Sequence, residues 1–178
     1  MSKRTDFILT ALKVISWIIF IGLCIQTGTL LFNYIYSLFK PVNVQNLHLG
    51  LNLSAIYAQS KTIYNFLFSF AIILSALKAF VFYLVIKIFQ ELNMVKPFSK
   101  EICELISKIS YYAFSAGITG IIADRYTRWL MHKGYEVDEL GRYWNDSQAY
   151  LLMAAIVFVI AIIFKKGIEL QSENDLTI

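Results

Sequence analysis

The chain has 178 residues, of which 58% are hydrophobic and only 16% charged, with a mean hydropathy of +0.60. These values exceed what the core of a soluble domain needs, so they exclude an ordinary water-soluble protein and predict the lipid bilayer as its surroundings. The formal charge of +4 is spread along the chain without a basic block, so no direct nucleic-acid partner is expected.

The first membrane-spanning helix is predicted at about residues 11–39. Val14 to Phe39 carries no charge and, at about 1.5 Å per residue, is long enough to cross a hydrocarbon core of roughly 30 Å with some tilt. Lys3 and Arg4 precede it as in a signal peptide. However, the apolar run is too long and lacks a small-x-small cleavage site, so an uncleaved anchor is predicted.

The loop after Pro41 has alternating character. Four leucines in it are separated by polar residues or glycine: Leu47, Leu49, Leu51 and Leu53. A period of two indicates either a short extracellular strand or an extended segment on the membrane surface. A strand this short would need a partner from another loop or another subunit.

The second spanning helix is predicted at about residues 55–92. Its apolar run, Tyr64 to Ile86, is interrupted only by Lys78, and nothing in the wider range breaks helical character. Ala71, Ser75 and Ala79 fall four residues apart. Such a stripe of small residues lets another helix approach closely, so we interpret it as a packing surface.

The third spanning helix is predicted at about residues 100–132, after a break at Pro97, which cannot continue a helix. Ser99 is predicted as its N-cap, and Phe98 and Cys103 lie where a hydrophobic staple would form. Four small residues at spacings of four predict further close contacts between helices: Ala113, Ala116, Gly117 and Gly120.

The stretch 124–148 is the most polar part of the chain, yet its aromatic residues indicate an interfacial belt. Asp124 and Arg128 have the spacing of a helical ion pair, and Lys133-Gly134 is typical of a helix end. The fourth spanning helix is predicted at about residues 147–166, followed by a cytoplasmic tail at 167–178.

Orientation follows from the basic residues. With the N-terminus inside, the inner segments hold nine Lys and Arg residues and the outer loops hold six, and the inner ones lie close to the helix ends. We therefore expect both termini in the cytoplasm. The sequence predicts a single membrane domain over residues 1–178, all-α, with four transmembrane helices.

Lys78 is the sharpest anomaly, because an ionised lysine within a span costs a few kcal/mol unless it meets water or a partner. Counting the helical rise places Gln26, the preferred partner, and Thr27 at nearly the same depth. Three interpretations stay open. Lys78 is neutral or reaches the interface through local thinning, makes an interior polar contact that sets packing or switching, or serves transport or a proton relay.

No catalytic, cofactor or metal site is predicted. The sequence has no P-loop, GxGxxG, HExxH or GxSxG motif, and His48 and His132 lack metal-ligand spacing. The two cysteines are too few for a zinc site. The expectation is a protein without enzymatic activity.

Two stretches resemble a bacterial membrane family, the one catalogued as domain of unknown function 2975. They are KPFSKE at 96–101 and the tail FKKGIELQSENDLTI at 164–178. The resemblance, which covers essentially the full length, implies four membrane helices in a bacterial cytoplasmic membrane. Family members often lie beside a small helix-turn-helix regulator, which implies a soluble partner. The residues expected to meet it are Pro97, Phe98, Ser99, Glu169, Asn174, Asp175 and Leu176.

The leading hypothesis is an inner-membrane sensor or regulatory partner of a small helix-turn-helix transcription factor. The alternative is an accessory or structural subunit of a larger membrane complex, which the small-residue stripes and large outer loops favour. A small transporter or channel is third. A protein partner is expected in either of the first two cases, and whether the chain forms a homo-oligomer stays open.

Overall fold

The computed structural model describes residues 3–39, 53–92 and 97–175, and every regular element in these ranges is helical. Four of the helices are long and apolar enough to cross a membrane, which confirms the predicted all-α class with four spanning helices. The elements in chain order are α1 (Lys3–Phe39), α2 (Ser54–Gln59), α3 (Lys61–Glu91), α4 (Lys100–His132), the 3₁₀ helix η3 (Asp138–Tyr143) and α5 (Ser147–Asp175).

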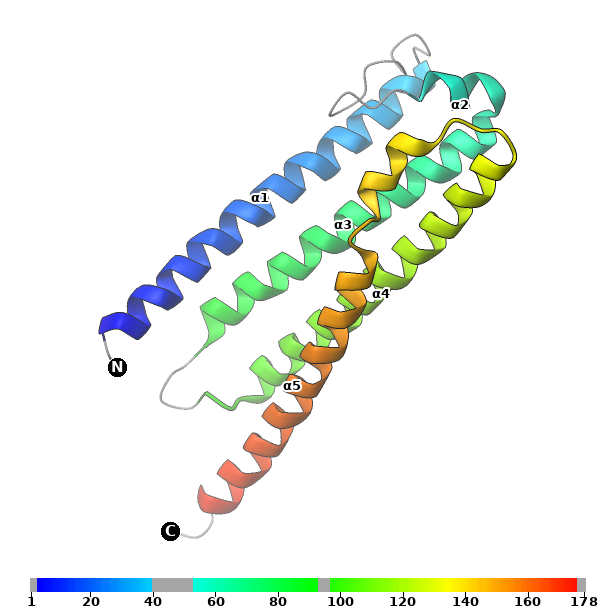
Figure 1. Cartoon of the computed structure of the whole chain (residues 1–178). Coiled ribbons are helices and arrows are strands. Elements are labelled where there is room, and N and C mark those ends of the chain that lie inside the picture. Colours follow the sequence, from blue (N-terminus) through cyan, green and yellow to red (C-terminus); the bar gives the residue numbers. More distant parts are fainter. Residues whose placement is uncertain (1–2, 40–52, 93–96, 176–178) are drawn as a thin grey trace.

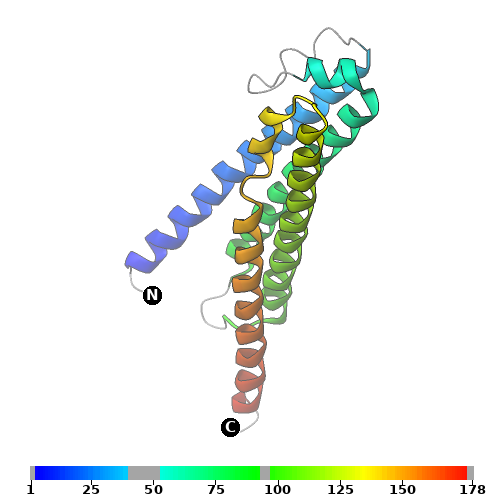
Figure 2. The ribbon, with the colours of Figure 1, turned by 45° about the vertical axis from the view of Figure 1, so that its right-hand side comes forward.

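The long helices pack in sequence order, α1 on α3, α3 on α4 and α4 on α5 (Figure 1). The two outer members of this row diverge, as Figure 2 shows for α1 against α4 and α5. Both ends of the chain lie at the same end of the molecule, because the number of long helices is even (Figure 1). We call this the terminal end and the opposite one the loop end.

The core of the described residues has three parts, which differ in the elements that build them. Near the loop end, α1, α3, α4 and the segment around η3 bury large side chains including Leu30, Phe68 and Trp144. Toward the terminal end, α3, α4 and α5 meet around Leu84 and Ile109, and a third cluster lies around Ile102 and Ala161. In the first part, η3 packs on α3 and α4.

Two predicted helix starts differ from the structure. Helix α1 begins at Lys3 rather than near residue 11, because hydropathy marks the span while polar residues such as Asp6 and Thr10 also extend the helix. The helix predicted at 55–92 is divided at Ser60, whose backbone is extended. The N–H of Ser60 donates to Ile56 O at 2.8 Å, and its hydroxyl accepts from Ile63 N at 3.4 Å. This serine therefore ends α2 and caps α3.

The predicted tail at 167–178 is largely helical, since α5 continues to Asp175 instead of ending near 166. Lys166 donates to Glu169 Oε2 at 2.6 Å, and the hydroxyl of Ser172 donates to the carbonyl of Glu169 at 2.7 Å. These local contacts stabilise the helix beyond residue 166, where the fall in hydropathy predicted its end.

The predicted strand cannot be compared with the structure, because Leu47, Leu49 and Leu51 lie outside the described residues. Leu53, the last of the four leucines, is described. It immediately precedes α2 and is only 1% exposed within the core.

Candidate functional site

The segment between α4 and α5 folds back into the molecule. Helix α4 ends where predicted, with Gly134 at φ +85°, a conformation that glycine adopts without strain. Ser147, the first residue of α5, lies against Gly120, roughly 18 Å along α4 from His132. On the way, four apolar side chains of the segment are buried: Val137, Leu140, Tyr143 and Trp144.

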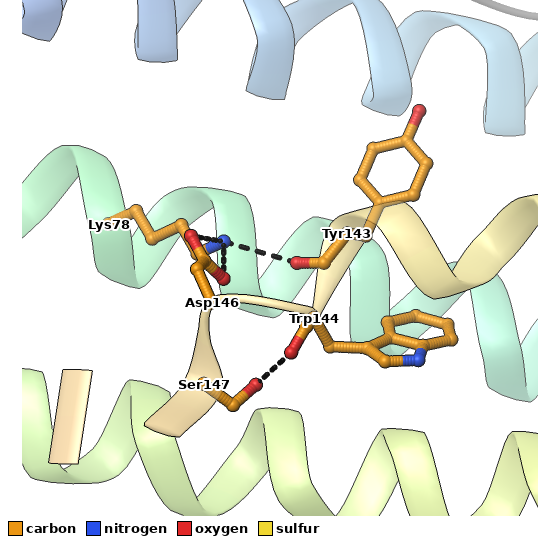
Figure 3. Close-up of polar contacts among 5 residues, drawn as sticks. All are labelled: Lys78, Tyr143, Trp144, Asp146 and Ser147. Atoms are coloured by element: carbon orange, nitrogen blue, oxygen red, sulfur yellow. Dashed lines mark hydrogen bonds and ion pairs between the residues drawn. The ribbon is translucent and has the colours of Figure 1, made fainter. Parts of the chain in front are cut away.

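Lys78 binds the end of this segment that precedes α5, at Tyr143 and Asp146 (Figure 3). Its Nζ donates to both carboxylate oxygens of Asp146, at 2.7 and 2.8 Å, and to the backbone carbonyl of Tyr143 at 3.1 Å. The ammonium also lies 5.4 Å from the centre of the Tyr150 ring. The side chain of Lys78 is 13% exposed and that of Asp146 is 48% exposed. One cation thus joins α3 to the start of α5.

The chemistry explains why a lysine suits this position. Irregular backbone that is buried among helices leaves some carbonyl groups without a helical hydrogen bond. These carbonyl groups must find a donor elsewhere in the protein. The ammonium supplies three donors, so it can serve the Tyr143 carbonyl and neutralise Asp146 at once. The hydroxyl of Tyr143 and Nε1 of Trp144 are buried without a hydrogen-bond partner in the described structure, so the segment is held at some cost.

The predicted contact between Lys78 and Gln26 is wrong, since Lys78 meets Asp146 and Tyr143 instead. Thr27 bonds a different residue of α3, Ser75, at 2.7 Å between the two hydroxyl oxygens. The depth count failed because it treated the whole stretch 124–148 as an outer loop, whereas part of it is buried against the long helices. Asp146, Tyr143 and Ser147 were missed for this reason. The apolar residues at 137, 140, 143 and 144, spaced three or four apart, were the sequence signal that this stretch is buried.

The small residues predicted to pack lie at helix contacts. A Cβ on Gly120 would overlap Ser147 Oγ, and one on Gly117 would stand 2.6 Å from Leu151 Cδ2. The hydroxyl of Ser147 donates to the carbonyl of Trp144. These two glycines let α5 begin close against α4. The other small residues are buried on the faces of α3 and α4: Ala71, Ser75, Ala79, Ala113 and Ala116.

At the terminal end, the two family-like stretches meet. The Phe98 ring lies 5.2 Å from the Phe164 ring, centre to centre, and a Cβ on Gly167 would stand 2.5 Å from Phe98 Cδ1. Ser99 accepts from Ile102 N at 3.2 Å, which confirms the predicted N-cap. We call Phe98, Phe164 and Gly167 the Phe98 junction.

Both residues of the predicted staple have contacts on α5, since the Phe98 ring packs on Phe164 and the thiol of Cys103 donates to Ala161 O at 3.7 Å. The staple between Phe98 and Cys103 stays a prediction. Pro97 is half-buried beside the junction, and Glu169 pairs with Lys166 at 2.6 Å. Asn174 and Asp175 close α5, where only their backbone is described, and Leu176 lies outside the described residues.

Comparison with known proteins gives one match. A family model described as "Protein of unknown function (DUF2975)" matches residues 48–178, which include both family-like stretches but not the first helix. No curated protein and no solved structure matches the chain.

Proposed function

The chain belongs to the DUF2975 family of proteins of unknown function, and from this premise we propose that it is a membrane-resident regulatory partner of a soluble protein. The soluble protein docks at the terminal end of the molecule. The family resemblance favours a small helix-turn-helix transcription factor as that partner, in the cytoplasm of a bacterium. In this proposal the chain has no enzymatic activity of its own.

The Phe98 junction is the observation that carries the proposal. Two stretches distant in sequence, 97–99 and 164–167, form one surface because the Phe98 ring fills the space above Gly167. A turn that only reverses the chain needs no aromatic contact with a fourth helix. The junction therefore supports a defined surface at this turn, and not only a connection between two spanning helices.

Helix α5 supplies the second part of that surface. The junction contacts α5 at Gly167, but the helix continues to Asp175, about 12 Å farther (Figure 1). Leu170 on this extension is 61% exposed, beside the ion pair of Lys166 and Glu169. An exposed leucine with flanking charges on a projecting helix is a usual anchor for a partner's groove.

A sensing role is supported by the Lys78–Asp146 pair at the loop end of α5. The pair ties the start of α5 to α3, while the Phe98 junction ties the other part of the same helix to the turn before α4. One rigid helix therefore touches both candidate sites. A change that breaks the pair can act on the docking surface by moving α5.

A second candidate function is an accessory subunit of a larger membrane complex. Helix α1 favours this second function. Only 6% of the residues in its most hydrophobic stretch are buried, so most of that helix is available to lipid or to other subunits. The transporter hypothesis has less support, because the charge of Lys78 is taken up by Asp146 and a backbone carbonyl.

Pull-down of the full chain from a mild detergent tests the proposal. We expect a soluble DNA-binding protein in the eluate, retained by wild type and reduced about tenfold or more by deletion of residues 165–178 and by Phe98→Ala. Phe114→Ala is the matched control, because Phe114 is a 53% exposed phenylalanine of α4 away from the junction. Equal recovery of the soluble protein after both changes would refute docking at this end. An eluate containing only membrane proteins would favour the second candidate.

A further inference from the structure

A narrow apolar groove lies between α3, α4 and α5 on the terminal side of the Lys78–Asp146 pair. Its volume is about 510 Å³. Along α5 it extends from Ala149 to Ile160, and Tyr150 is the only wall residue whose side chain carries a polar group. Helix α3 contributes Val81, Val85 and Ile88 to the wall, and α4 contributes Ile106 and Ile109.

We propose that this groove binds one acyl chain of a phospholipid with an ammonium headgroup, the chemistry of phosphatidylethanolamine, with the headgroup at Asp146. The proposal does not depend on a docking partner at the terminal end.

The dimensions of the groove fit an acyl chain and exclude a helix. From Ala149 to Ile160 the groove is roughly 17 Å long, about half of a hydrocarbon core of roughly 30 Å, which is the depth of one leaflet. The volume spread over this length leaves a cross-section of about 30 Å². A helix with its side chains is about 10 Å across, so a helix from a second copy cannot lie inside the groove and could insert only side chains into it.

Asp146 marks the end of the groove where a headgroup belongs. It lies one helical turn before Ala149 and Tyr150, so it stands above the groove on the same face of α5. The run between Asp146 and Lys165 carries no charge and is about 27 Å long, close to the hydrocarbon thickness. The pair therefore lies at the level of one hydrocarbon boundary of α5.

Exposure determines which headgroup charge fits. Within the pair, the carboxylate side is 48% exposed whereas the lysine is 13% exposed and covered by Tyr150. The group of the pair that a headgroup can reach is therefore the carboxylate. An ammonium group can approach Asp146 from the open side and share its oxygens with Lys78, whereas a phosphate headgroup without an ammonium brings no cation to this carboxylate.

Native mass spectrometry of the delipidated full chain tests the proposal with two lipids of equal acyl chains. We expect phosphatidylethanolamine to bind about tenfold more tightly than phosphatidylglycerol, with one lipid retained per chain. Ala149→Trp fills the headgroup end of the groove and should weaken this binding about tenfold. Leu152→Trp is the matched control, because Leu152 is a 64% exposed residue of α5 outside the groove wall.

A further variant separates headgroup selectivity from groove occupancy. Asp146→Asn should abolish the preference between the two lipids while the apolar groove still accepts an acyl chain. Retention of the helical circular dichroism spectrum and of a monodisperse elution profile would show that each variant is folded. Equal binding of both lipids by wild type would overturn the proposal, as would unchanged binding by Ala149→Trp. A dimer that replaces the bound lipid would also overturn it.

Discussion

The role of Lys78 in the structure differs most from the role that the sequence suggested. In the sequence it interrupts an apolar span, and in the structure it is a connector that gives one bond to a backbone carbonyl and two to a carboxylate. A leucine at this position would leave Asp146 and the Tyr143 carbonyl without these donors. The lysine therefore stabilises the fold rather than disturbing it.

The first prediction concerns this pair. Lys78→Met and Asp146→Asn should each lower the free energy of unfolding by about 1–3 kcal/mol, because each leaves a partly buried group without its partner. The half-exposed carboxylate keeps the loss below that of a fully buried pair. The double variant should lose at least about 1 kcal/mol less than the sum of the two. Unfolding in mixed micelles with increasing dodecyl sulfate measures all three.

Lys87→Met is the control for that cycle, since Lys87 lies over the Tyr83 ring at 5.5 Å on the same helix. Its loss should stay below about 1 kcal/mol. Strict additivity of the two single changes would show that the contact between Lys78 and Asp146 contributes nothing to stability.

Gly120 gives the second prediction. Gly120→Ala should destabilise the protein by about 1–3 kcal/mol, because the new methyl group would overlap Ser147 Oγ and push the start of α5 away. Replacing Ser147 by glycine in the same chain should recover part of the loss by making space. Thermal denaturation followed by size exclusion measures the series.

Gly28→Ala is the matched control, because a Cβ at Gly28 meets nothing within 4 Å. Exchange of an interior helical glycine for alanine should then raise stability by up to about 1 kcal/mol. If both glycines behaved alike, the close approach of α4 and α5 at Gly120 would be disproved.

At the scale of single elements, helix caps explain where the chain is divided. Ser60 and Ser99 both precede helices and accept from the N–H group three residues later. Only Ser99 was predicted as a cap, since Pro97 signals a break before it, whereas nothing before Ser60 stops a helical pattern. A serine between two helical runs is a weak signal, because serines also occur within helices, as Ser115 does here.

Ser99→Ala is the third prediction and should lower stability by about 1 kcal/mol through loss of the cap of α4. Amide exchange at Ile102 should accelerate, since its N–H group loses its acceptor. Ser115→Ala, which removes an exposed hydroxyl that bonds its own helix, should change neither quantity appreciably. Unchanged exchange at Ile102 would contradict the capping role.

The long helices could be predicted from the sequence, whereas the path of the segment between α4 and α5 could not. The four long helices follow from runs of apolar residues, because burial in lipid needs only length and hydropathy. The return of residues 135–146 into the molecule was not predicted, because the aromatic residues of this polar stretch also fit an interfacial belt. The apolar residues at 137, 140, 143 and 144 are a signal of burial, but they do not distinguish these two arrangements by themselves. Asp146 is recognisable as a partner of Lys78 only when the depth of that loop is known. The Phe98 junction likewise depends on how α4 and α5 align.

At the scale of the molecule, the helices are longer than the bilayer. The span over α3 has 31 residues, about 46 Å, against a hydrocarbon core of roughly 30 Å. Such helices tilt or project beyond the membrane. The divergence of α1 from α5 in Figure 2 means that they do not share one tilt. In the part near the loop end, buried aromatic residues from α3 and from the segment around η3 gather in one cluster: Tyr64, Phe68, Tyr143 and Trp144.

The last prediction tests which end of this molecule faces the cytoplasm. Both termini lie at the terminal end, and basic residues near the helix ends there favour the cytoplasmic side. In a chain with Cys24 and Cys103 replaced by alanine, Lys133→Cys at the loop end should react with an impermeant maleimide on intact cells. Ser172→Cys should react only after permeabilisation. Leu152→Cys, exposed on the surface of α5 within the span, should react with neither treatment until detergent is added. Labelling of Ser172→Cys on intact cells would reverse the orientation and place the Phe98 junction beyond the reach of a cytoplasmic partner.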